Sequence, residues 1–400
     1  MTILLIVVRS LRQHLLSTII TALSIALAGG LLMSVWVVKE QSQSAFTQVN
    51  TGFDAVLGAR GSKLQLVLNA IFHLEASPGN VAAADYEAIK HHPAVKLAVP
   101  IAVGDNLRGF RIVGTVPEFL TDVEYTPGKK FAFAAGKLFD PAAKEAVLGS
   151  FAAQKLGLKI GDTFHPYHGL AFDANSQHPD TYVVTGLLAP SNTPADKVVW
   201  IPLHGLQTLA GHDPRTATDV SAVLIQLRTP TAGLMLDMMY NKQGNRLTFA
   251  YPIGAIMAEL FGKIGWFDQV LTLIAYLVAL VSAGGVLVAI YNSMNARRRD
   301  IAILRALGAR RRTICGAIIL EAAAIGTLGM LAAFAVYAAI LTGVAAVIRA
   351  QTGVLLDPWT ANPIMLWAPL GMIALCALGG LVPAWKAYRT DVAENLSPVS

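Results

Sequence analysis

The sequence predicts a membrane protein with four transmembrane helices and a large α+β extracytoplasmic domain inserted between helices one and two. Three observations support this fold class. The 400 residues are 54% hydrophobic and only 14% charged, whereas a soluble domain carries about 25% charged residues. Four runs stay apolar over the roughly 20 residues that a bilayer-crossing helix needs. A long and more polar stretch, 39–266, separates the first run from the second.

The four predicted spans are nearly free of charge. Their only charged residues are Asp268, at the edge of the second span, and Glu321 in the third. A carboxylate in a bilayer is costly unless it is paired, so Glu321 is predicted to face the bundle and to form a hydrogen bond or ion pair rather than to couple protons. Four glycines, Gly284, Gly285, Gly326 and Gly329, are predicted to be close-packing points between spans. The spans are 15–38, 267–291, 314–348 and 362–385.

Residues 1–14 are predicted to form a cytoplasmic helix on the membrane surface. Arg9 and Arg12 precede an apolar run, and residues 26–28, Ala-Leu-Ala, have the small-x-small pattern of a signal-peptide cleavage site. However, the apolar run continues to Val38. The sequence therefore predicts an uncleaved anchor, with a cleaved signal peptide as the alternative.

The basic residues predict the orientation. Segments 1–14, 292–313 and 386–400 hold eleven basic and three acidic residues, while the rest of the chain holds 20 basic and 22 acidic residues. Because cytoplasmic segments carry the excess of Lys and Arg, both termini are predicted to be cytoplasmic. The domain 39–266 and the short loop 349–361 then lie outside. The high pI of 9.3 reflects this topology, and binding of nucleic acid is not predicted because no aromatic residues interleave the arginines.

The extracytoplasmic domain has mixed helix and strand patterns. Helices are predicted at 39–50, 63–71, 83–91, 150–156 and 231–240. Strands are predicted at 95–103, 109–116, 146–148, 159–164, 182–188, 198–201, 220–227 and 247–250. The domain is expected to fold without a disulfide, since the two cysteines, Cys315 and Cys376, lie in or beside spans.

Eight of the nine histidines fall in this domain, and three of them, His165, His168 and His178, share one irregular loop. Such a loop could present imidazoles to zinc. It lacks cysteine and has Pro166 between the first two histidines, so no metal site is predicted, and metal binding by the three histidines is kept as the alternative. The chain has no GxSxG or HExxH motif, and residues 58–63 lack the spacing of a phosphate-binding loop.

The stretch 295–313, between spans two and three, contains seven arginines and a single acid, Asp300. Ile301, Leu304 and Leu307 recur at a spacing of three, which gives an apolar ridge on a helix, and Gly308 interrupts the pattern. A short cationic helix of this kind can lie on anionic lipid or dock into a groove of another protein. A loop whose arginines only set the topology is the alternative.

This stretch resembles the RRREIAILRALGASRRQI loop of the MacB/FtsX-type (LolC/LolE-like) ABC transporter permeases. Residues 318–334, IILEAAAIGTLGMLAAF, look like the start of the third span in that family. Residues 379–396 are similar to the family ending PAWRAARxDPxEAL, with Val392 where the family has proline. Two strings of the outer domain, AVLGSFAAQKLGLKIGDTF and YVVTGLL, resemble the MacB-like periplasmic core domain. The resemblance covers all four spans and the domain order.

The resemblance implies an FtsX-like permease domain at 267–396 in a subunit that works by mechanotransmission with a separate ATPase, which binds the ATP. The chain itself is then not an enzyme and has no catalytic residue or cofactor. The resemblance also implies two permeases, as a homodimer or heterodimer, with two ATP-binding subunits in a bacterial inner membrane. The implied ATPase-coupling residues are Arg298, Arg299, Ile301, Leu304, Arg305, Leu307 and Gly308.

The expected activity is export or extraction of a hydrophobic compound, a peptide or a lipoprotein. Two alternatives stay open. One is an FtsX-like regulatory complex, which controls an extracytoplasmic protein partner without transport. The other is a membrane-anchored metal-binding receptor, for which the histidines of the outer domain are the support.

Overall fold

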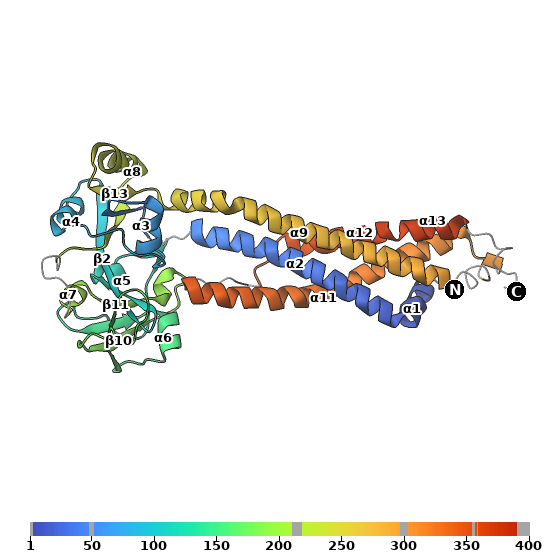
Figure 1. Cartoon of the computed structure of the whole chain (residues 1–400), viewed down its shortest axis with the longest axis horizontal. Helices are drawn as coiled ribbons and strands as arrows, with labels where there is room; N and C mark the ends of the chain where they lie inside the picture. Colours follow the sequence, from blue (N-terminus) through green and yellow to red (C-terminus); the bar gives the residue numbers. More distant parts are fainter. Residues whose placement is uncertain are drawn as a thin grey trace. The chain divides into compact units, whose positions relative to one another are not determined.

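The computed structural model describes residues 3–47, 52–209, 218–296, 308–353 and 359–389, together with Ile303, Arg305, Ala306 and Asp357 (Figure 1). The chain divides into two compact units. We call them the helical unit and the α/β unit. The helical unit comprises Met1–Gln41, Ile264–Ala345 and Asp357–Ser400, and the α/β unit comprises Ser42–Lys263 and Ala346–Leu356.

The helical unit contains four helices that are long and apolar enough to cross a membrane. Three of them extend beyond the predicted spans, because helical backbone continues into the polar flanking residues. The membrane-capable helices are α2 (Leu15–Thr47), α9 (Ile253–Ala296), α11 (Arg311–Thr352) and α12 (Ile364–Gly379). Two short helices accompany them, α1 (Ile3–Gln13) and α13 (Leu381–Arg389).

Glycines on α11 allow close approach of neighbouring helices. A Cβ atom on Gly329 would lie 2.6 Å from Cβ of Ile25 on α2, and one on Gly326 would lie 3.1 Å from Cβ of Cys376 on α12. The predicted close packing at these two positions is confirmed. By contrast, nothing lies within 4 Å of a Cβ placed on Gly284 or Gly285 in the described part of the chain. The same prediction for these two residues is therefore wrong within a single chain, because both lie on the exposed face of α9, whereas the neighbouring Ala283 and Val286 are buried.

The α/β unit is built on a mixed sheet of eleven strands, with the path β13-β1-β12-β2-β3-β11-β7-β10-β6. In chain order these strands are β1 (Ala55–Ala59), β2 (Val95–Leu107), β3 (Phe110–Thr115), β6 (Phe133–Gly136), β7 (Glu145–Leu148), β10 (Tyr182–Leu188), β11 (Val199–Pro202), β12 (Ala222–Leu227) and β13 (Leu247–Ala250). Strand β8 (Thr163–Phe164) pairs with β10, and β9 (Tyr167–His168) pairs with β2. A separate hairpin joins β4 (Glu124–Thr126) to β5 (Lys129–Lys130).

Short helices cover the sheet. They are α3 (Lys63–Ala70), α4 (Ala83–Lys90), α5 (Glu118–Thr121), α6 (Ser150–Leu156), α7 (Leu203–Gln207) and α8 (Pro230–Asp237). A 3-10 turn spans Pro194–Lys197, and a π-helical segment, Met238–Gln243, continues α8. Local signals explain several boundaries: Ser62 caps α3 by accepting from the amide of Gln65, and Gly157 ends α6 in a left-handed conformation with φ 69°.

The strands are apolar on both faces because both faces of the sheet are covered. In β1, Val56 points to one core, whereas Ala55 and Leu57 point to another, as the period of two along a strand requires. In β11, Trp200 joins Val56 in the first core, while Val199 lies in a third. The sheet thus has one core that runs along a whole face and two smaller cores on the opposite face.

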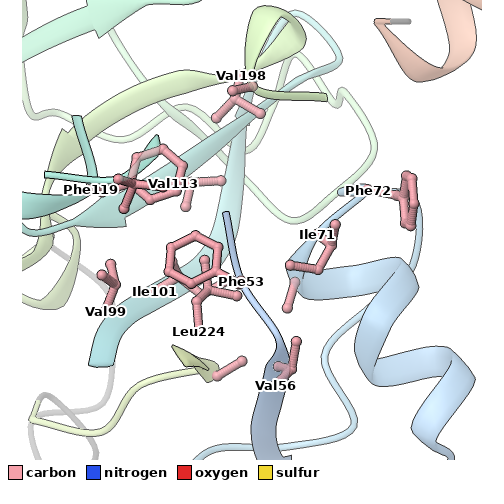
Figure 2. Packing of buried hydrophobic residues seen from close by; sticks show 14 of the residues in the cluster. Phe53, Val56, Ile71, Phe72, Val99, Ile101, Val113, Phe119, Val198 and Leu224 are labelled. Carbon is pink, nitrogen blue, oxygen red and sulfur yellow. The ribbon is translucent and has the colours of Figure 1, made fainter. Parts of the chain in front are cut away.

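We call the first core the aromatic core, because Phe53, Phe119 and Trp200 lie in it. Figure 2 shows Phe53 and Phe119 among its aliphatic residues. The ring centroids of Phe119 and Trp200 are 4.4 Å apart. Two residues from the start of α9, Ile253 and Met257, are buried in the same core. The first residues of a membrane-capable helix are therefore part of the core of the α/β unit.

Most predicted elements of the α/β unit are confirmed, and the helix at Ser150–Leu156 and the strands Tyr182–Leu188 and Leu247–Ala250 have the predicted limits. The strand predicted at 159–164 is wrong over most of its length, because Gly161 turns the chain with φ 90° and leaves only β8. Strand β2 continues past its predicted end, Val103, to Leu107. Strands β1 and β6 were not predicted, and both are short.

Candidate functional site

The arginine-rich loop between α9 and α11 is described only in part. Arg298, Arg299, Ile301, Leu304 and Leu307 lie outside the described residues. Ile303, Arg305 and Ala306 have helical backbone. The amide of Gly308 donates to the carbonyl of Arg305 at 3.0 Å, and Gly308 has φ 97°. Helices commonly end at a glycine in this left-handed conformation. Gly308 is also the residue at which the apolar spacing of three in the sequence ends.

The base of this loop contacts helix α13. The ammonium group of Lys386 donates a hydrogen bond to the hydroxyl of Tyr291 on α9 and lies 4.1 Å from the centroid of its ring. The guanidinium carbon of Arg311, the first residue of α11, lies 5.2 Å from the ring centroid of Tyr388. Cation–π contacts of this kind contribute about 0.5–1 kcal/mol each at exposed sites. Both ends of the loop are thus held by one helix.

We call these four residues, Tyr291, Arg311, Lys386 and Tyr388, the loop base. Sequence reasoning did not find the loop base, because each contact joins residues far apart in the chain. The only local signal was that Lys386 and Tyr388 follow a predicted span and can reach the same membrane surface as the arginine loop.

Glu321 is buried in the helical unit, where the hydroxyl of Ser10 on α1 donates a hydrogen bond to its carboxylate. Ser10 is itself fully buried. A hydrogen bond to a charged group offsets part of the cost of removing it from water. The contact ties the N-terminal helix α1 to α11, a role for α1 that its amphipathic sequence alone did not indicate.

The α/β unit also holds the end of α11. The guanidinium carbon of Arg349 lies 5.0 Å from the ring centroid of Phe151 on α6. The ammonium group of Lys197 donates to the carbonyl of Gln351 at 2.6 Å. The backbone then turns at Gly353, with φ 78°. Together with Ile253 and Met257 of α9, these contacts attach the α/β unit to the ends of two membrane-capable helices; we call them the span anchors.

A small cavity of about 20 Å³ lies beside the aromatic core. This volume has room for about one water molecule. Aromatic and aliphatic side chains dominate its wall: Phe53, Ala70, Ile71, Phe119, Tyr125, Phe131, Pro194, Ala195, Trp200 and Leu224, with His73 and Thr193. Burial, and then the charge of Arg111, lowers the pKa of His73 to about 3, so its imidazole is neutral at physiological pH.

The structure separates the three histidines of the irregular loop. His168 and His178 converge on Asp105, and their ring centroids are 5.5 Å apart. Nδ1 of His165 instead lies 3.0 Å from the carbonyl of Asp180. Sequence reasoning did not select Asp105, because the residue lies in the part of β2 beyond the predicted end of the strand.

Comparison with protein-family models gives two matches. The model described as FtsX-like permease C-terminal matches residues 272–392, and the model described as MacB-like periplasmic core domain matches residues 18–233, which is more than half of the chain. The chain belongs to the MacB/FtsX-like family of ABC-transporter-type permeases. This finding confirms the resemblance and the predicted fold class. The permease is thus a membrane protein with an extracellular-type α/β domain between its first and second spans.

Two solved structures resemble parts of the permease. The extracellular domain of the noncanonic ABC-type transporter YknZ from Gram-positive bacteria is 16% identical and has a TM-score of 0.31; the match covers 49% of the permease and 99% of that chain. The periplasmic region of MacB from Actinobacillus actinomycetemcomitans is 8% identical and has a TM-score of 0.36; the match covers 54% and 94% of the two chains. A search of curated proteins gives no match. The family assignment rests on the two domain models.

Proposed function

We propose that the permease is the transmembrane subunit of an ABC transporter that works by mechanotransmission with a separate ATPase. The observation that carries this proposal is that α9 and α11 have specific contacts at both ends. The span anchors attach them to the α/β unit, and the loop base attaches them to α13. The subunit itself is not the catalyst, and ATP is bound by the partner.

Long helices with fixed ends can transmit movement. The helices α9 and α11 have 44 and 42 residues, so each is about 65 Å long at 1.5 Å per residue. A displacement applied to the arginine loop is then passed through the helix to residues packed in the aromatic core, because close-packed interiors deform little. The loop would receive the displacement from the ATPase through Ile301, Leu304 and Leu307, with Arg298, Arg299 and Arg305 contacting acidic groups or lipid.

The membrane arrangement follows from the same proposal. The N-terminus, the arginine loop and the C-terminus lie in the cytoplasm, and the α/β unit lies outside the bacterial inner membrane. Two permeases, identical or different, act with two ATP-binding subunits. The proposed cargo is a hydrophobic compound, a peptide or a lipoprotein, as the family resemblance implies.

The variant Leu304→Asp tests the proposal. An aspartate on the apolar ridge would be buried without a partner in the ATPase groove, which costs several kcal/mol, so we expect loss of ATPase coupling with normal membrane insertion. The matched control is Ile303→Asp, one residue off the ridge, where the side chain is exposed. The measurement is ATP hydrolysis by the reconstituted complex.

Two results would contradict the proposed function. Full coupling in the Leu304→Asp variant would contradict the assignment of the ridge. A co-purifying extracytoplasmic enzyme, together with ATP hydrolysis that no cargo stimulates, would favour the regulatory complex over transport.

A further inference from the structure

Asp105, His168 and His178 form a compact cluster of ligand-type side chains in the α/β unit. Nε2 of His178 lies 3.1 Å from Oδ1 of Asp105, and Nδ1 of His168 lies 3.4 Å from the same oxygen. All three ligand atoms lie within 4.8 Å of one another. We propose that this cluster is a binding site for a divalent transition-metal ion, with Zn²⁺ as the best-fitting ion. The proposal is independent of the transport function.

The distances suit a tetrahedral site. Zinc bonds to imidazole nitrogen and carboxylate oxygen are about 2.0–2.2 Å long, so neighbouring ligand atoms are about 3.3–3.5 Å apart. The 3.4 Å distance from His168 to Asp105 matches this spacing, and the 3.1 Å distance from His178 is slightly shorter. The wider separation between the two histidines closes by rotation of His168, whose side chain is 63% exposed. Two imidazoles and one carboxylate are a common protein ligand set for zinc.

Backbone pairing brings the ligands together before any ion binds. In the ladder between β2 and β9, His168 stands directly opposite Asp105. A β-bridge between Tyr167 and Gln177 then places His178 beside the same strands. The amide of His178 donates to the carbonyl of Pro166 at 2.8 Å. A preformed arrangement lowers the entropy cost of binding.

A buried asparagine supports the loop that carries His168. The side-chain amide of Asn106 donates to the carbonyls of Gly169 and Ala171, at 2.9 and 3.1 Å. Its oxygen accepts from the amide of Gly109 at 3.0 Å. Hydrogen bonds around a metal site fix the positions of its ligands. A β-bulge between Val103 and Asp105 interrupts the ladder next to the cluster, and such bulges often re-aim a side chain at a functional site.

The cluster is closed on one side and open on the other. Asp105 is fully buried and His178 is nearly so, whereas His168 is exposed. With these three described residues as ligands, one tetrahedral position remains, which water or a donor atom of another molecule can complete. A site of this form can exchange its fourth ligand, unlike a closed structural zinc site.

A plain hydrogen-bond network between histidine and aspartate is the competing explanation, because the hydrogen bond between His178 and Oδ1 of Asp105 can form without an ion. The two explanations differ in one measurable way. Only a metal site makes the second histidine, His168, necessary for binding an ion from solution.

The test uses the full chain in detergent, with an affinity tag that lacks histidine and with Cys315 and Cys376 replaced by alanine. The protein is stripped with a chelator and titrated with Zn²⁺, and bound metal is measured by elemental mass spectrometry. We expect one Zn²⁺ per chain in the parent protein and at least tenfold weaker binding in His168→Ala. The matched control is His165→Ala, three residues away, which should bind as the parent does.

Two further readouts separate loss of the site from loss of the fold. Zn²⁺ should raise the unfolding temperature of the parent and of His165→Ala but not that of His168→Ala, while all three proteins unfold at similar temperatures without metal. Co²⁺ in the parent should give the visible absorption of a tetrahedral site. Absence of Zn²⁺ binding at micromolar concentration in the parent, or equal binding by His168→Ala, would overturn the proposal. Equal weakening by both histidine variants would overturn the ligand assignment.

Discussion

His73 lines the aromatic cavity, and its surroundings keep the imidazole uncharged. Its ring makes an edge contact with Trp200, with centroids 5.7 Å apart. Nδ1 is shielded from solvent and has no hydrogen-bond partner among the described residues. Burial and the neighbouring Arg111 lower the pKa to about 3 from 6.5. Protonation of this one side chain therefore opposes the folded state.

The lowered pKa predicts a loss of stability in acid. Because the unfolded chain binds this proton more readily, the stabilisation is complete above about pH 6.5 and falls as the pH drops toward about 3, by at most about 1.4 kcal/mol per pH unit. His73→Asn removes the titration and keeps a residue that tolerates the left-handed backbone at φ 55°. The measurement is the unfolding temperature of the full chain at about pH 7 and about pH 5.

The control for this prediction is His91→Asn, at an exposed histidine on the surface of the same unit. It should show the full acid sensitivity of the wild type. An equal loss of stability in wild type and His73→Asn on acidification would show that His73 does not carry the effect.

At the scale of elements, the attachment of α11 to the α/β unit depends on few contacts. Lys197 donates to the last turn of α11, and burial, with Arg111 nearby, lowers the pKa of its ammonium group. A charged donor to a carbonyl is worth about 1.5 kcal/mol or more. The substitution Lys197→Met removes this contact and keeps a side chain of similar length.

Lys197→Met should therefore loosen the end of α11. We expect the amide protons of residues 346–353 to exchange with solvent roughly tenfold faster, as a loss of about 1.4 kcal/mol in local stability implies, and ATPase coupling to weaken. Hydrogen exchange read by mass spectrometry measures this directly. The matched control is Lys155→Met. It removes a cation from the ring of Phe151, which Arg349 also contacts, and leaves the hydrogen bond of Lys197 intact. Unchanged exchange in Lys197→Met would contradict the role of this anchor.

Local sequence patterns predict some elements of the α/β unit and leave others without a signal. The helix Ser150–Leu156 and the strand Tyr182–Leu188 have local patterns strong enough to fix their limits. Strand β9 has only two residues and exists because it pairs with Asp105 and Asn106, sixty residues earlier. Such pairing leaves no local signal. The convergence of His168 on Asp105, and the loss of His165 from the group, therefore required the tertiary structure.

At the scale of the whole molecule, the amino-acid composition and its distribution along the chain predicted the class of protein. Four charge-poor runs, an arginine-rich loop and a long polar insertion were enough to predict the membrane class, and the family models confirm the assignment. The contacts that hold the ends of α9 and α11 were not predictable, because they join residues such as Lys386 and Tyr291 from distant parts of the chain. The proposed mechanism depends on these contacts.

We propose that the permease transmits movement from a separate ATPase through the arginine loop. The most direct measurement is crosslinking in native membranes from a single cysteine at position 304, in a chain that lacks Cys315 and Cys376, followed by mass spectrometry of the crosslinked protein. We predict a stoichiometric ABC ATP-binding subunit captured by Leu304→Cys and much less of it by the off-ridge control, Ile303→Cys. No ATP-binding subunit at either position would contradict the claim and leave the arginine loop as a topology signal.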